Sequence, residues 1–124
     1  MIKERSQKAV EILTKNDRGG YTVPTSKLYP HQWNWDSAFS ALGISTYNKI
    51  RAWQELIILI RAQWKNGMIP HIIFHENNPN YFPGPNHWQI KSNANTSCHS
   101  QPPVLASIIL SLIHISEPTR LELI

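Results

Sequence analysis

The sequence predicts an all-α protein in which amphipathic helices alternate with long, aromatic-rich loops. Residues 2–15 and 48–66 place apolar side chains at helical spacing. Between them and after them lie loops rich in proline and aromatic residues, with six prolines in residues 68–103 alone. Pro103 suits the first turn of a further helix that begins at Val104. A chain of 124 residues has room for one domain at most.

The first two helices are predicted from short apolar repeats and from cap residues. In residues 2–15, Ala9, Ile12 and Leu13 fall on one helical face, and Gly19-Gly20 is expected to stop the helix. Asp36 is expected to begin a second helix through Leu42, because Asp36 and the serine after it are both favourable cap residues.

The helix predicted over residues 48–66 has the clearest periodicity. Its apolar face comprises Ile50, Trp53, Leu56, Ile57, Ile60 and Trp64. Asn66-Gly67 is expected to end it. Glu55 lies beside this apolar face, and we expect its carboxylate to be solvated.

Charge and composition exclude several partners. The net charge is +4, but the cations are spread along the chain without a basic run, so nucleic-acid binding is not expected. No apolar run approaches the roughly 20 residues of a membrane span, and the N-terminus lacks the apolar core of a secretory signal. The single cysteine, Cys98, excludes an internal disulfide, and we expect a cytoplasmic location. The oligomeric state is not specified by the sequence.

The segment Leu28–Asp36, with sequence LYPHQWNWD, combines three aromatic rings, a histidine, two amides and a carboxylate. Sugars fit such a surface, because their C–H faces lie against indole rings and their hydroxyls need fixed donors and acceptors. A buried tryptophan pair beside a capping aspartate explains the composition equally well.

Two histidines, His71 and His75, raise the alternative of a metal-dependent hydrolase. The segment Ile72–Phe74 between them favours extended backbone, in which residues four apart lie roughly 13 Å apart, too far for one metal ion. The H-E-x-x-H motif does not occur in the sequence. We therefore expect neither a metal nor another cofactor.

Several uncommon motifs occur together in one order. They are NDRGGYTVPT (16–25), LYPHQWNWDSAF (28–39), RAWQEL (51–56), NGMIPHI (66–72), YFPGP (81–85) and SQPPV (100–104). With them the stretch from about residue 16 to 106 resembles the mannosylglycerate and glucosylglycerate hydrolases, six-hairpin glycosidases grouped with glycoside hydrolase family 63. One departure from the family pattern is Cys98-His99, which stands where the family has glycine and an aliphatic residue.

This resemblance implies that residues 1–109 are the N-terminal part of an (α/α)6 toroid. It further implies inverting hydrolysis of a small α-glycoside, with both catalytic carboxylates outside this chain, so that the chain alone is inactive. Tyr29, Trp35 and Asp36 match positions of the substrate-binding wall that hold the sugar and the glycerate. Tyr81 and Gln101 match positions that contact the glycerate. A carbohydrate-binding module without catalytic activity is the second alternative.

The last residues need a separate interpretation. Residues 110–120, with sequence LSLIHISEPTR, are identical to the translation of a transposon-type sequencing adapter. The spacing of the index that follows such an adapter also accounts for residues 121–124. We therefore expect residues 110–124 not to be native, and we exclude them from functional interpretation.

Overall fold

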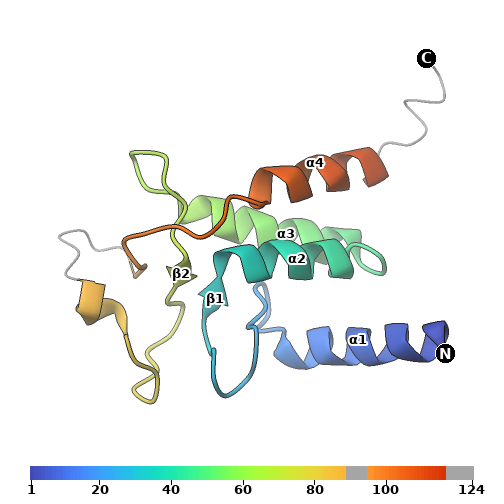
Figure 1. The fold of residues 1–124 in the computed structure, drawn as a ribbon, viewed down its shortest axis with the longest axis horizontal. Helices are drawn as coiled ribbons and strands as arrows, with labels where there is room; N and C mark the ends of the chain where they lie inside the picture. Colours follow the sequence, from blue (N-terminus) through green and yellow to red (C-terminus); the bar gives the residue numbers. More distant parts are fainter. Residues whose placement is uncertain (89–94, 117–124) are drawn as a thin grey trace.

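The computed structural model describes residues 1–88 and 95–116 of the chain, and its architecture is helix-rich (Figure 1). The elements in chain order are α1 (Ile2–Asn16), β1 (Gln32–Trp33), α2 (Asn34–Ile44), α3 (Lys49–Arg61), β2 (Ile72–Ile73), the 3-10 helix η1 (Pro85–Trp88) and α4 (Leu105–Ser116). The predicted helix-rich architecture is confirmed. Residues 117–124, the larger part of the predicted non-native tail, lie outside the described residues, whereas residues 110–116 form the end of α4.

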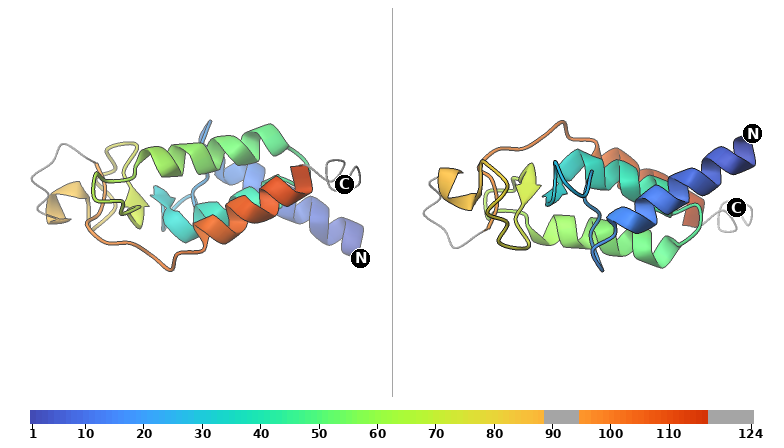
Figure 2. Two further views of the ribbon diagram at one scale, coloured as in Figure 1. Left: turned by 90° about the horizontal axis from the view of Figure 1, so that it is seen from above. Right: turned by 90° about the horizontal axis from the view of Figure 1, so that it is seen from below.

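Helix α1 agrees with the prediction for residues 2–15 and leaves the body of the molecule at one end (Figures 1 and 2). Most of its surface is exposed, and only its last residue, Asn16, is buried. Leu13 packs partly against the core at the point where α1 approaches α2. The helix ends at Asp17, which has extended backbone with φ −71° and ψ 130°. Gly19, with φ +86°, then turns the chain back towards the core.

Helices α2 and α3 form a hairpin, but their ends differ from the prediction. Helix α2 begins at Asn34, two positions before the predicted start, and Trp33 occupies its N-cap position without a side-chain cap. The expectation that Asp36 starts the helix is therefore wrong, because the strand pairing of β1 already fixes the backbone up to Trp33. Asn48 caps α3 instead, since its side chain accepts the Arg51 N–H at 3.0 Å.

Helix α3 is shorter than predicted. It ends at Arg61, and residues 62–68 form turns in which Trp64 N–H donates to the carbonyl of Met68 at 2.8 Å. Gly67 adopts φ +93° within this turn, a conformation that favours glycine. Asn66-Gly67 therefore lies in a turn beyond the helix, and the expectation that these residues end the helix is wrong.

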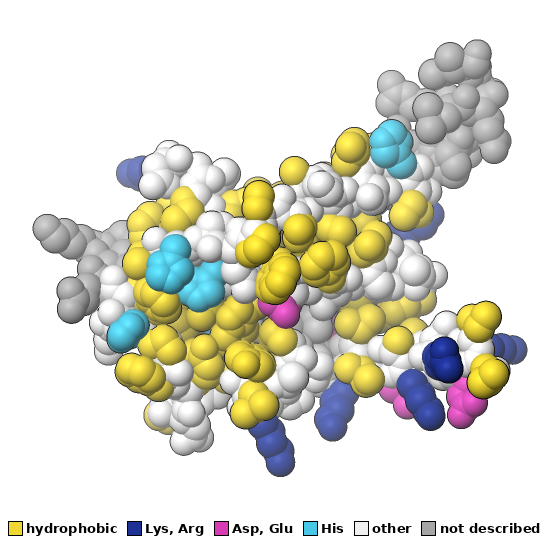
Figure 3. Space-filling view, viewed as in Figure 1, with side chains coloured by type: hydrophobic (Ala, Val, Ile, Leu, Met, Phe, Trp, Pro, Cys, Tyr) yellow, Lys and Arg dark blue, Asp and Glu magenta, His cyan; other side chains and the backbone are white. Residues whose placement is uncertain are grey.

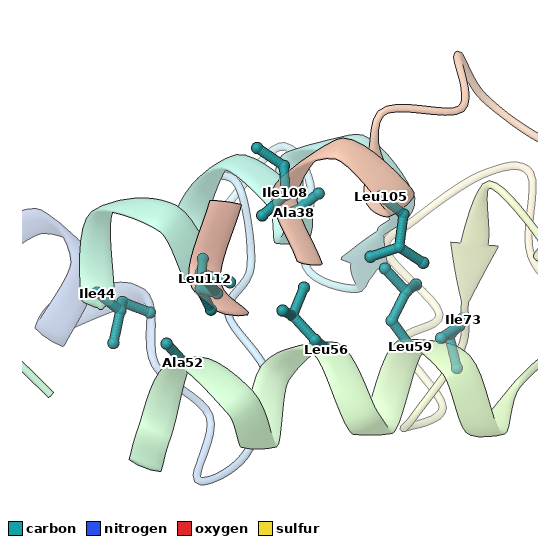
Figure 4. Close-up of a cluster of buried hydrophobic side chains, with 10 residues drawn as sticks. Ala38, Ile44, Ala52, Leu56, Leu59, Ile73, Leu105, Ile108 and Leu112 are labelled. Carbon is teal, nitrogen blue, oxygen red and sulfur yellow. The ribbon is translucent and has the colours of Figure 1, made fainter. Parts of the chain in front are cut away.

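Helix α4 lies across the α2–α3 hairpin and closes the core (Figures 2 and 4). The buried apolar cluster takes side chains from all three helices and from β2: Ala38, Ala41, Ile44, Ala52, Leu56, Leu59, Ile73, Leu105, Ile108 and Leu112. Alanines on α2 let the larger leucines of α3 approach closely. The buried face of α3 differs from the predicted one. Leu56 is buried as expected, but Ile50, Ile57 and Ile60 are exposed, and Ala52 and Leu59 pack into the core instead.

A small antiparallel sheet ties the loops to this core. Strand β1 pairs with β2, with Gln32 opposite Ile73 and Trp33 opposite Ile72, and Thr96 adds an isolated bridge to Ile73. The extended backbone predicted over Ile72–Phe74 is confirmed at β2. Its partner β1 was not predicted. The sheet brings three distant loops together beside the N-terminal end of α2.

Many apolar side chains remain on the surface. Figure 3 shows them gathered over the middle of one face, with lysine and arginine side chains around α1. On the helices, Ile12, Phe39, Ile50 and Ile57 expose between 44% and 85% of their surface. No helix in the described ranges is both long and apolar enough to cross a bilayer.

Candidate functional site

A cavity of about 490 Å³ opens at the N-terminal end of α2. Its walls come from the loop after α1, from β1, from the first turn of α2 and from the segment before α4. The lining residues are Pro24, Thr25, Tyr29, Trp33, Trp35, Asp36 and Gln101. Four of the five residues singled out in the sequence therefore share one cavity, and Tyr81 is the exception.

Gln101 connects the last loop to the first turn of α2. Its Oε1 accepts the backbone N–H of Trp35 at 3.0 Å. Burial raises the pKa of Asp36 above its ordinary value of 3.8, while hydrogen bonds from its own N–H and from the Gln101 side chain offset only part of this rise. Asp36 is thus a half-buried carboxylate whose charged form is disfavoured by its surroundings. Its oxygens can accept further hydrogen bonds from a ligand.

Aromatic rings form the apolar part of the cavity. Tyr29 meets Trp33 edge to face, with ring centroids 5.2 Å apart. Trp35 lies beside Phe39 at 6.2 Å and exposes 40% of its surface. Since Trp33 is buried and Trp35 is exposed, the two tryptophans do not form the buried pair considered above. Trp33 packs at the base of the cavity, and the ring of Trp35 is accessible to solvent.

Tyr81 lies one layer behind the cavity. Its ring packs edge to face against Trp33 at 5.5 Å and against His31 at 5.2 Å. Burial, and then the neighbouring Tyr29, raise the pKa of its phenol. In this structure Tyr81 supports the aromatic wall and is not among the lining residues of the cavity.

Glu55 is the main residue that the sequence analysis misjudged. Its side chain is 0% exposed, so the expectation of a solvated carboxylate is wrong. The carboxylate accepts hydrogen bonds from Thr22 N–H at 2.9 Å, Thr22 Oγ1 at 2.8 Å, Ser37 Oγ at 2.6 Å and Arg51 Nη1 at 2.9 Å. These donors replace the water that the charge loses on burial. The helical periodicity places Glu55 at the edge of the core, but it does not show that two other segments, through Thr22 and Ser37, supply donors there.

Arg51 extends this network to the end of α1. Its Nε and Nη2 donate to the two carboxylate oxygens of Asp17 at 2.9 and 3.0 Å, a bidentate pair. Burial raises the pKa of Asp17, but the hydrogen bonds from Arg51 and from the N–H groups of Gly19 and Gly20 outweigh it, so the pKa lies below 3.8. One guanidinium therefore binds both a half-buried carboxylate, Asp17, and a fully buried one, Glu55.

The two histidines of the metal alternative lie in different surroundings. His75 stacks on Tyr21 with ring centroids 3.9 Å apart, and its Nε2 lies 2.7 Å from Gln32 Oε1. His71 stacks on His99 at 4.9 Å. Within residues 1–88 and 95–116, no three histidine, cysteine or acidic side chains are grouped as metal ligands.

Comparison with known proteins gives this cavity a family context. The family described as the mannosylglycerate hydrolase MGH1-like glycoside hydrolase domain matches residues 29–121 of the chain. The chain belongs to this family. Tyr29, Trp35, Asp36 and Gln101 all fall within the part of the chain that matches the MGH1-like domain.

Individual relatives in the MGH1-like family are similar over nearly the whole chain. Mannosylglycerate hydrolase of Thermus thermophilus is 51% identical over 116 residues, which is 91% of this chain and 28% of the relative. Mannosylglycerate hydrolase MGH1 of Selaginella moellendorffii is 46% identical, over 91% and 23%. Glucosylglycerate hydrolase of Mycolicibacterium hassiacum is 42% identical, over 86% and 25%. The chain thus spans about a quarter of the length of these relatives.

Solved structures agree with the sequence relatives. The crystal structure of the family 63 mannosylglycerate hydrolase from Thermus thermophilus in complex with Tris superposes with a TM-score of 0.84 at 48% identity, over 93% of this chain and 27% of that one. The complex of that enzyme with Tris and D-glycerate gives 0.80 at 51% identity, over 86% and 25%. The helix-rich arrangement of this chain therefore matches a segment of a larger glycosidase.

Proposed function

We propose that this chain is part of an inverting glycoside hydrolase that acts on a small α-glycoside such as glucosylglycerate or mannosylglycerate, and that it supplies a wall of the substrate site. The observation that carries the proposal is the shared cavity of Tyr29, Trp35, Asp36 and Gln101. Its volume of about 490 Å³ falls in the usual range of roughly 300–1,000 Å³ for small-molecule sites.

The chemistry of the walls fits a hydroxyl-rich ligand. The exposed ring of Trp35 offers an apolar face to a pyranose, and Asp36 offers carboxylate oxygens to its hydroxyl groups. Tyr29 and Gln101 add a phenol and an amide to the lining, and Gln101 lies beside Trp35 and Asp36. We assign Tyr29, Trp35 and Asp36 to the sugar and the glycerate, and Gln101 to the glycerate. We propose that Tyr81 also contacts the glycerate in the full-length protein, although in this structure it packs behind Trp33.

Inverting hydrolysis needs one carboxylic acid to protonate the leaving oxygen and one carboxylate to activate water, with roughly 6.5–9.5 Å between them. Asp36 is the one acidic residue among the residues that line the described cavity. We therefore place the catalytic acid and base outside this chain and assign Asp36 to substrate binding. On this proposal the chain alone hydrolyses no glycoside.

The exposed apolar helix faces fit a chain that continues into a closed (α/α)6 toroid. Ile50 and Ile57 of α3 expose 85% and 44% of their surface, and Phe39 of α2 exposes 51%. Further helices of the toroid would cover such faces. We expect the isolated chain to associate with itself or precipitate when concentrated, because these faces meet water.

We further propose that the native sequence departs from the printed one after residue 109. Residues 110–116 continue α4, and Leu112 is 1% exposed in the core. A helical tail does not contradict the proposal, because the adapter translation itself places Leu112 and Ile115 on helical spacing after Ile108. Amplifying the gene from its source DNA and reading past codon 109 tests this. A genomic frame that encodes residues 110–124 as printed would overturn it.

The test of function uses the full-length protein from that gene. We expect it to hydrolyse glucosylglycerate or mannosylglycerate in a reducing buffer without added metal, as expected for a cytoplasmic enzyme. Tyr29→Phe should raise KM for the substrate, whereas Tyr47→Phe, which alters a tyrosine in the turn between α2 and α3, should not. A full-length protein that binds these glycosides without cleaving them would favour the carbohydrate-binding alternative. Activity that requires zinc and is lost in His75→Ala would favour the metal-dependent one.

A further inference from the structure

We propose that Glu55 is a positioning residue that holds two walls of the cavity in place from behind, acting through Ser37 and Thr22. The inference rests on the proposed function, because it takes the cavity as the substrate site. Glu55 itself does not line the cavity. It lies on α3, and its buried carboxylate contacts residues next to two of the lining segments.

The first wall is the start of α2. Ser37 is 0% exposed, and its Oγ donates to Glu55 Oε1 at 2.6 Å. Ser37 directly follows Trp35 and Asp36 in the first turn of the helix. A helix turn held at Ser37 has little freedom at the two residues before it. The bond therefore fixes the direction in which Trp35 and Asp36 enter the cavity.

The second wall is the loop that follows α1. Thr22 donates to Glu55 twice, through its N–H at 2.9 Å and its Oγ1 at 2.8 Å. Val23, the next residue, is 0% exposed, and its N–H donates to the carbonyl of Asn16 at 2.9 Å. Pro24 and Thr25, which line the cavity, follow at once. One carboxylate thus anchors the chain on both sides of the cavity.

The arrangement is more specific than packing requires. A buried ion is costly, and an apolar residue of similar size would serve stability alone as well. A carboxylate instead binds several donors at once in defined directions, and Arg51 supplies the counter-charge at 2.9 Å. Fixed side chains matter in an active site, because a misplacement of about 1 Å can lower the reaction rate by about 100-fold.

Each wall has its own variant in the 124-residue chain. Ser37→Ala removes one oxygen and leaves Glu55 with its bonds from Thr22 and Arg51. Thr22→Val keeps the shape of the side chain and the backbone bond but removes both Oγ1 bonds, the one donated to Glu55 and the one accepted from Arg51 Nη2 at 3.3 Å. Ser107→Ala, at an exposed serine of α4, is the matched control. The readouts are hydrogen exchange of backbone amides by mass spectrometry, and titration of the Asp36 carboxyl by carbon-13 NMR at concentrations below self-association. Neither readout needs a sugar or a hydrolysis step.

We expect each variant to loosen its own wall. In Ser37→Ala, amides of residues 35–37 should exchange about tenfold faster, as expected when one hydrogen bond is lost. The pKa of Asp36 should move down towards 3.8 as the carboxyl gains water. In Thr22→Val, the faster exchange should appear at residues 22–25 and leave the Asp36 titration unchanged. Ser107→Ala should change neither readout.

Two results together would overturn the proposal: faster hydrogen exchange across all helices in both variants, and an unchanged Asp36 titration in Ser37→Ala. Glu55 would then contribute only to the stability of the fold. Failure of both variants to fold, judged by circular dichroism, would overturn it in the same way. Because the readouts are independent of substrate, a failure here differs from a failure of the proposed hydrolase function. In that second case the full-length protein would cleave no glycoside while the two walls still respond separately.

Discussion

Gln101 accepts the backbone N–H of Trp35 at 3.0 Å although 66 positions of the chain separate the two residues. The bond joins the loop before α4 to the first turn of α2 and closes one side of the cavity. The exposed tryptophan ring and the half-buried Asp36 therefore owe their placement to a residue near the far end of the described chain. Four predictions follow from this site and from its supports.

Removing the Gln101 side chain should change both stability and the titration of Asp36. In Gln101→Ala the free energy of unfolding should fall by about 1 kcal/mol, the usual net value of one hydrogen bond. The pKa of Asp36 should rise further, because the Gln101 hydrogen bond lowers it in the native chain. Urea unfolding and carbon-13 titration measure the two effects. Gln7→Ala, at an exposed position of α1, is the control, and an unchanged Asp36 pKa would contradict the prediction.

Asp36 and Asp17 should respond to neutralisation in opposite directions. The folded-state pKa of Asp36 lies above 3.8, so its charge destabilises the fold at pH 7, and Asp36→Asn should raise the urea midpoint there. The folded-state pKa of Asp17 lies below 3.8, so Asp17→Asn should lose about 1 kcal/mol at pH 7. Both effects should become smaller as the pH falls and the two carboxyls take up protons. Equal shifts of the same sign would refute the assignment.

Acidification should destabilise the fold through its histidines. Burial lowers the pKa of His31, His71 and His75 below 6.5. Their contribution to stability is present above pH 6.5 and is lost as the pH falls through the lower folded-state values, because the unfolded chain then binds more protons. Urea midpoints measured from pH 7.5 down to pH 5 should fall. His31→Phe, which keeps an aromatic ring against Phe74 and Tyr81, should flatten this fall. A slope identical to that of the native chain would show that His31 does not titrate in this range.

The hydrophobic core should tolerate truncation far less than the exposed face of the same helix. Leu56 is 0% exposed within the α2–α3–α4 cluster, and Leu56→Ala should cost about 2–5 kcal/mol. Ile50 is 85% exposed, and Ile50→Ala should change stability by less than about 0.5 kcal/mol. Thermal or urea unfolding separates the two. A large loss in Ile50→Ala would mean that a second copy of the chain covers this face.

The helices could be predicted from the sequence because their signals are local. Apolar spacing and glycine positions place α1 and α3 within a few residues of their observed ends. The predicted start of α2 was two residues too late, because the pairing of β1 with β2 sets the observed start. These strands are about 40 residues apart in the chain, and each is only two residues long. Such short strands carry no periodicity that a sequence pattern can show.

The candidate site was predictable to a different degree. The aromatic and polar composition of LYPHQWNWD indicated a sugar-binding surface or a packed tryptophan pair without deciding between them. The family resemblance, not the spacing, selected Gln101 and Tyr81. Only the structure shows that Gln101 reaches α2 and that Tyr81 stands behind Trp33. The buried environment of Glu55 was missed because its donors come from Thr22, Ser37 and Arg51, on three separate segments.

The α2–α3 hairpin has a consequence for the order in which the fold assembles. Its two helices are joined by a turn of four residues, 45–48, so their contacts close a short loop at little entropic cost. The strand pairing and the bond from Gln101 close much longer loops and add only a few hydrogen bonds each. We expect the hairpin to form early and the cavity walls to dock late. Under native conditions the cavity should then open by local undocking of the loops while the hairpin stays folded, which leaves the substrate-facing surface free to adapt without loss of its scaffold.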